Sequence, residues 1–203
     1  IAVLVLLAFI LVASWNAIQT VIYVDENGEE HTGISAARNL EETKNEWKGY
    51  LTEDVLAEAI RENAKINSSS QFNSNDVQEQ NKAYAKRQGI EDIRDMFNLS
   101  FKAFDGEYDY YLVDGLGMDA AAQMYEKRTE NLKSWLYSGK KEAAGFTEDE
   151  KAFLINQYQK RQTPVYYEAA DGWDAMLTYL IMVAFITVLV CGVITAGIFS
   201  GEF

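Results

Sequence analysis

The apolar positions of this chain are concentrated in two uncharged runs, one near each end. No charged residue occurs in residues 1–24 or in residues 175–201. An α-helix rises 1.5 Å per residue, so about 20 residues cross a hydrocarbon core roughly 30 Å thick. Both runs reach that length. The pattern therefore predicts two membrane-spanning helices with a polar domain held between them.

The first run has a second interpretation. Residues 1–12 are apolar and are followed by the small residues Ala13 and Ser14, as in a secretory signal peptide. However, no positively charged leader precedes them, and the apolar character resumes over residues 18–24. We favour a span over a signal peptide here, and a buried helix is the third interpretation.

The second run is the clearer of the two. Trp173 and Tyr179 lie near its leading edge, where aromatic side chains anchor a helix at headgroup depth. No ionisable side chain lies within either run, so neither predicts a proton relay or an ion site. Two spans place both ends of the chain on one side of a membrane and the middle domain on the other.

Charge is confined to the middle of the chain. All 18 Lys and Arg residues, and every acid except Glu202, lie between the two runs, giving 30 acids against 18 bases. A domain with this excess of negative charge repels nucleic acid, which we therefore exclude as a partner. The lone cysteine, Cys191, excludes a disulfide within the chain and a cysteine-based metal site.

The middle domain has the periodicity of helices joined by polar turns. Thr52 followed by Glu53 and Asp54 predicts a helix start, and Thr147 with Glu150 matches a capping box. Further helices are predicted over Ser35–Tyr50, Val77–Phe97 and Met118–Tyr137. The polar stretch Asn63–Asn75 predicts a loop, and the segment after Asp105-Gly106 predicts an extended connector.

Few residues suggest chemistry. The sole histidine, His31, lies among acids, and a divalent-cation site is conceivable there, although a solvated loop is the favoured interpretation. The stretch Asp114-Gly-Leu-Gly lacks the lysine of a phosphate-binding loop, and no motif of a nucleophilic or zinc hydrolase occurs. The sequence predicts a protein that is not an enzyme and that uses no cofactor.

Several segments, in order, resemble one family. They are GISAARNL, WKGYLTEDVLAEAI at residues 47–60, MYEKRTENLKSWL at residues 124–136 and FTEDEKAFLINQYQKRQTPVYYEAADGWDAM at residues 146–176. The last segment is AGIFSGEF, in which Phe199, Ser200, Glu202 and Phe203 fit the phrase Phe-Ser-x-Glu-Phe/Tyr. Together they resemble the start of an export-type (type 2) permease subunit of bacterial ABC transporters from Firmicutes.

The resemblance implies an all-α integral membrane protein, in which two transmembrane helices flank an extracytoplasmic helical domain. Transmembrane helix 1 would occupy residues 1–24, the acidic domain 25–172, transmembrane helix 2 residues 173–198, and the start of a cytoplasmic coupling segment 199–203. The protein would lie in the cell membrane as a multi-pass component, with both termini cytoplasmic. This chain would be the first third of such a permease.

The resemblance also implies partners. The phrase at residues 199–203 would contact an ATP-binding ABC subunit, which hydrolyses ATP to drive export of an unknown substrate. Membrane lipid and either a second permease copy or the remaining spans of the same permease would complete the assembly.

Two other functions fit the same pattern. A two-span membrane sensor with a helical extracytoplasmic ligand-sensing domain has the same order of segments, and differs only in the segment beyond residue 203. A membrane-anchored scaffold or adhesion module is the third hypothesis. Topology by itself does not select among them.

Overall fold

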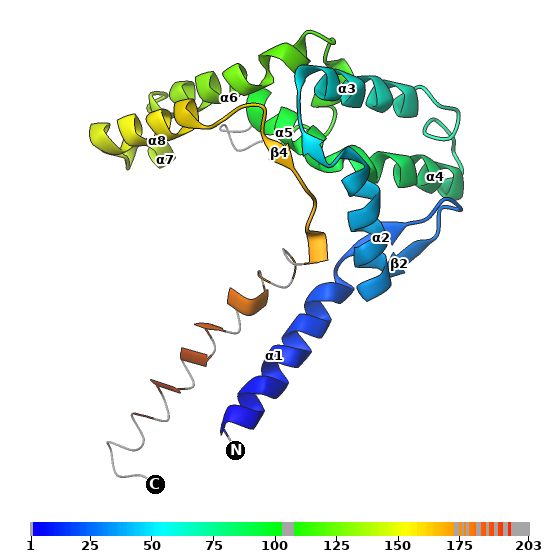
Figure 1. Cartoon of the computed structure of the whole chain (residues 1–203), viewed down its shortest axis with the longest axis vertical. Coiled ribbons are helices and arrows are strands. Elements are labelled where there is room, and N and C mark those ends of the chain that lie inside the picture. The colour runs from blue at the N-terminus through cyan, green and yellow to red at the C-terminus, as the bar shows by residue number, and fades with distance from the viewer. Residues whose placement is uncertain are drawn as a thin grey trace.

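A computed structural model describes residues 2–102 and 108–172, together with 175, 177, 179–181, 184–185, 187–188, 191–192 and 195. The chain is mainly helical (Figure 1). The α-helices are α1 (Ala2–Gln19), α2 (Ile34–Lys44), α3 (Glu53–Asn67), α4 (Val77–Arg87), α5 (Glu91–Phe101), α6 (Ala120–Leu136), α7 (Lys141–Ala144) and α8 (Glu148–Lys160). The 3₁₀ turns are η1 (Asn45–Trp47), η2 (Gln88–Ile90) and η4 (Leu112–Gly115).

Two small antiparallel sheets accompany the helices, so the expectation of a purely α-helical fold needs correction. Strands β1 (Ile22–Val24) and β2 (Glu30–Thr32) form one hairpin, in which Tyr23 lies opposite His31. Strands β3 (Gly49–Tyr50) and β4 (Tyr166–Tyr167) form the other sheet. The second pair joins segments more than a hundred residues apart and closes the domain.

The predicted first membrane span is wrong. The helix α1 has 18 residues, and at 1.5 Å per residue it measures about 27 Å, less than the roughly 30 Å of a hydrocarbon core. Its last turns carry the polar residues Ser14, Asn16 and Gln19. Within the part of the chain that the structure describes, no helix combines the length and apolarity needed to cross a bilayer.

The same finding contradicts the rest of the predicted membrane topology. Most of the predicted second span, residues 173–198, lies outside the described residues. The described positions within it do not amount to a crossing helix. A two-span integral membrane fold, a multi-pass place in the cell membrane and an extracytoplasmic middle domain therefore have no support. The error came from measuring runs of uncharged residues, which overstated the length of the first helix.

The main core lies where α3, α5 and α6 meet, below η4. Helix α3 turns the face that carries Leu56 and Ile60 toward this core, as its helical spacing predicts, and α5 contributes Ile93 and Phe97. Ten buried side chains form the cluster: Leu51, Leu56, Ala59, Ile60, Ile93, Phe97, Val113, Ala120, Ala121 and Met124. This core fixes α3 relative to α5 and α6.

Three predicted helix boundaries agree with the structure. Helix α3 begins after Thr52, whose Oγ1 accepts a hydrogen bond from the Val55 N–H at 3.4 Å. Helix α8 begins after Thr147 with the predicted capping box to Glu150. Helix α6 lies within the predicted Met118–Tyr137. The starts of α3 and α8 are specified by local side-chain acceptors, which is why the sequence alone locates them.

Other boundaries differ. The predicted helix over Val77–Phe97 is broken at η2, and the predicted helix over Ser35–Tyr50 ends at Lys44. The predicted loop over Asn63–Asn75 begins late, since α3 continues to Asn67 and buries Ile66. The described part of the predicted extended connector, Tyr108–Asp114, contains no strand, but it is not extended throughout, because its last residues form η4.

Candidate functional site

The last segment of the domain lies beside a segment near its start. Residues 165–172, here called the return segment, run antiparallel to residues 44–51. Leu51 N–H donates to the Val165 carbonyl at 2.9 Å, and Ala169 N–H donates to Asn45 Oδ1 at 2.8 Å. The segment ends beside α1, where a Cβ placed on Gly172 would lie 3.7 Å from Ile18 Cδ1. The described chain thus enters and leaves the domain at one place.

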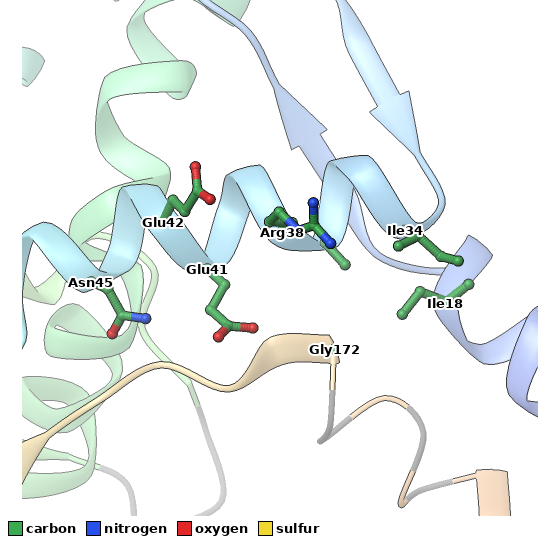
Figure 2. Close-up of a pocket in the computed structure, with 8 residues that line it drawn as sticks. Ile18, Ile34, Arg38, Glu41, Glu42, Asn45 and Gly172 are labelled. Atoms are coloured by element: carbon green, nitrogen blue, oxygen red, sulfur yellow. The ribbon is translucent and has the colours of Figure 1, made fainter.

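An open pocket of about 530 Å³ lies at this junction. We call it the α2 groove. Figure 2 shows Ile18 and Ile34 together at one end of it, and Glu41 and Asn45 on the side of α2 that faces Gly172. The groove is therefore apolar at one end and charged along α2. Its apolar wall adjoins the small cluster of Val21, Ala37 and Leu40.

A buried ion pair holds the groove together. Lys44, at the end of α2, donates hydrogen bonds to Asp171 in the return segment and to Asp92 Oδ1 on α5, the latter at 2.8 Å. Tyr167 Oη donates to the other oxygen of Asp92, also at 2.8 Å. Burial alone would lower the pKa of the Lys44 ammonium, but its bonds to Asp171 and Asp92 outweigh burial and raise that pKa above 10.5.

A second, larger pocket of about 770 Å³ lies between α3, α4, η1 and β1. We call it the acidic groove. Its lining includes the aromatic side chains of Tyr23 and Trp47 and the apolar Val24, Ala85 and Ile90. Six charged side chains also line it: Glu26, Glu46, Glu58, Glu62, Lys82 and Lys86. The carboxylates come from three separate elements of the fold and outnumber the lysines.

Contacts to β1 and α2 hold the wall of the acidic groove that α4 and η2 form. Gln88 is buried and bonds both backbone groups of Val24, accepting from its N–H at 3.1 Å and donating to its carbonyl at 2.7 Å. Gly89 packs against α2 so closely that an added Cβ would lie 3.2 Å from Thr43 Cγ2. These contacts explain why the predicted Val77–Phe97 helix breaks at η2.

Two arginines lie in the interior beside this wall. Arg94 donates to Asn63 Oδ1 and, at 2.6 Å, to the Tyr110 carbonyl. Arg87 is fully buried and stacks under the Tyr110 ring, with the centre of its guanidinium 4.4 Å from the ring centroid. Burial raises the pKa of the neighbouring Glu91 carboxyl, and the charge of Arg87 partly offsets that rise.

The hairpin of β1 and β2 gathers three groups with metal-binding atoms. Side-chain atoms of Asp25, Glu29 and His31 lie within 4.8 Å of one another, and Asp25 Oδ2 is 3.1 Å from His31 Nε2. The backbone N–H of Glu29 and the His31 ring lower the pKa of Asp25. All three side chains are at or near the surface, and the Glu29 backbone N–H and the His31 ring both bond to the Asp25 carboxylate. The solvated-loop interpretation of His31 stays a prediction.

The predicted site residues are not gathered by the described structure. Phe199, Ser200, Glu202, Phe203 and Trp173 lie outside the described residues. Tyr179 is described and half-buried. Coupling to an ATP-binding subunit thus stays a prediction from the resemblance, and anchoring by Trp173 stays a prediction from the aromatic pattern at the edge of the second apolar run.

Sequence reasoning missed the buried charges. In the sequence, Arg87 and Arg94 continue the spacing of the buried Ala83 and Ile90, at steps of three and four residues. A charged residue at a position with apolar spacing is the sequence signal that could have identified these buried arginines. By contrast, the carboxylates of the acidic groove come from distant segments, and no local pattern brings them together.

We compared the chain with protein-family models, with curated proteins and with solved structures, and none of them matches it.

Proposed function

We propose that this chain is a non-enzymatic binding component of an ABC exporter, working with a separate ATP-binding subunit. The family resemblance of the ordered segments at residues 47–60, 124–136 and 146–176 motivates the proposal. The two membrane spans predicted from the sequence play no part in it. The exported molecule is not identified by these segments.

One structural observation carries the proposal. Ile18 and Gly172 lie side by side, although 153 residues separate them in the sequence. Domains whose entry and exit are adjacent are suited to insertion between two segments of a larger protein. A domain inserted in this way can serve as the binding part of a larger transport protein, because the segments that flank it stay together.

The geometry also favours binding over catalysis. The two grooves offer carboxylates, aromatic rings and apolar side chains. The only histidine of the chain is bonded to Asp25 at the surface and lines neither groove. A domain of this kind contacts a transported molecule or a partner protein without changing it chemically.

The test is association with an ATP-binding subunit. The full-length protein would be tagged in its own cell and purified as the wild type, as the double variant Glu202→Ala, Phe203→Ala, and as the control Glu126→Ala. We expect an ABC ATP-binding subunit to purify with the wild type and the control, and to be lost from the double variant. Purification of a signalling kinase in its place would overturn the proposal and support the ligand-sensing alternative.

A further inference from the structure

We propose that the acidic groove binds a cationic peptide segment, with a lysine or arginine side chain of the ligand among Glu26, Glu46 and Glu58. The inference rests on the proposed function only in treating the chain as a binding component. It names the chemical class of the ligand, which the resemblance leaves open.

The size and surface of the groove fit a ligand. Its volume of about 770 Å³ lies within the range of roughly 300–1,000 Å³ that is typical of ligand sites. Val24 and Ile90 are buried and provide an apolar floor. Half-buried Trp47 and Tyr23 add aromatic faces, to which the cationic heads and aliphatic stems of lysine and arginine are both attracted.

The carboxylates that line the groove favour a positively charged ligand. Glu26 and Glu46 form no ion pair with any described residue, so both carboxylates are available to a ligand. Glu58 and Glu62 pair with Arg61 and Lys65 on the surface of α3, outside the lining. Surface pairs of this kind are weak, and a ligand cation can compete for their acids.

The lysines of the groove are already engaged. Lys82 Nζ lies 2.6 Å from Glu79 Oε1, and Lys86 Nζ donates to Gln71 Oε1 at 2.8 Å. Both lysines lie on α4, whereas the four acids lie on the other walls. Each lysine therefore already has an acceptor other than the carboxylates that line the groove. The formal net charge of −13 on the chain also draws cations toward it.

The groove is held open by groups that a ligand does not need to move. Gln88 ties β1 to η2 through both backbone groups of Val24, and Trp47 packs against the cluster of Ile66, Ala83 and Ile90. A cavity with rigid walls loses little conformational freedom when it binds. This favours recognition of an extended segment by a surface that already has its bound shape.

The experiment uses the whole chain and two synthetic probes. One is a fluorescent peptide of alternating glycine and lysine, and the other has norleucine at every lysine position, which keeps the aliphatic stem and removes the charge. Titration followed by fluorescence anisotropy would give affinities at low and physiological salt. We expect saturable one-to-one binding of the lysine peptide that weakens with salt, and much weaker binding of the norleucine peptide.

Matched variants separate the groove from general charge. Glu46→Gln with Glu58→Gln removes two charges from the groove, and Glu53→Gln with Glu126→Gln removes two from outside it. Since an exposed ion pair contributes up to about fivefold in affinity, we expect the groove variant to bind roughly tenfold more weakly. The control should change by less than about twofold. Circular dichroism would establish that both variants are folded.

Two outcomes would overturn the inference. Equal weakening by the groove and control variants would mean that the peptide responds only to net charge. Equal affinity for the norleucine peptide would mean that the groove does not select cations. Either result leaves the association with an ATP-binding subunit untouched, because that association is measured separately through residues 202 and 203.

Discussion

Lys44 and Asp171 are joined by a buried ion pair across 127 positions of the sequence. Lys44 ends α2, and Asp171 lies next to the last residue of the return segment. The pair is one of the contacts that hold the end of the domain against its beginning, together with the bond from the Leu51 N–H to the Val165 carbonyl. Lys48 and Glu168 form a second, exposed ion pair between the return segment and residues 44–51.

We expect Lys44→Met to lower the free energy of unfolding by about 2 kcal/mol, because the change leaves Asp92 and Asp171 without their shared partner. Urea titration followed by circular dichroism measures this. The control is Lys48→Met, which removes the exposed pair and should lower the free energy of unfolding clearly less than Lys44→Met does. Equal losses in the two variants would contradict a special role for the buried pair.

Alkaline pH should weaken the same cluster. The pKa of Lys44 is raised above 10.5 by its two aspartates, and that of Tyr167 is raised above 10.0 by burial and by Asp92. Both groups hold their protons more tightly in the folded protein, so their contribution is complete below those values and is lost as pH rises through the folded pKa. We expect the free energy of unfolding to fall above about pH 10, with a shallower fall in the double variant Lys44→Met, Tyr167→Phe. Identical pH profiles for the variant and the wild type would refute this linkage.

Gln88 is expected to determine how firmly β1 is attached. Gln88→Ala leaves the buried N–H and carbonyl of Val24 without partners, which should cost about 2–3 kcal/mol. Hydrogen exchange at Val24 should accelerate together with the loss of stability. Gln78→Ala is the matched control, since Gln78 bonds the same hairpin only at the exposed Asn27 carbonyl. A comparable effect at both glutamines would show that the buried bonds add nothing.

The start of α8 depends on its capping box. Thr147→Ala removes the acceptor for the Glu150 N–H and should destabilise α8 by about 1 kcal/mol. None of the described side chains of α8 is fully buried, so we expect the loss as local fraying, seen as faster amide exchange over residues 148–152. Thr129→Ala, in the middle of α6, is the control and should leave that exchange unchanged.

Low pH should also increase fraying at the start of α8. The backbone and hydroxyl of Thr147 lower the pKa of Glu150. The cap therefore contributes fully above the usual pKa of 4.5 and is lost as pH falls through the lower folded value. Amide exchange in the wild type at mildly acidic and strongly acidic pH measures this, and exchange that stays constant would contradict it.

The parts of the fold that depend on local chemistry were predictable. Thr52 and Thr147 mark helix starts because each supplies an acceptor to the first turn of its helix. The end of the long predicted helix at Gln88 was not predictable, since its cause is a bond to Val24, 64 positions away. Asn63 looked like a loop residue, yet it is buried in α3, where it accepts from Arg94.

The membrane prediction failed for a different reason. The absence of charge over residues 1–24 was treated as the length of a helix, but α1 ends at Gln19 and the chain continues into β1. Val21 and Val24 are buried by contacts within the domain, and this accounts for their apolar character. The candidate site was still less accessible to sequence reasoning, because Glu26, Glu46 and Glu58 come to line one pocket only after folding.

The adjacency of Ile18 and Gly172 has a mechanical consequence. A body held at a single attachment point can rotate about that point without altering the separation of the two segments that hold it. A ligand in the acidic groove can therefore reorient or stiffen the domain, but it does not pull those segments apart. Their spacing is set inside the α2 groove, where Ile18 and Ala37 flank Gly172.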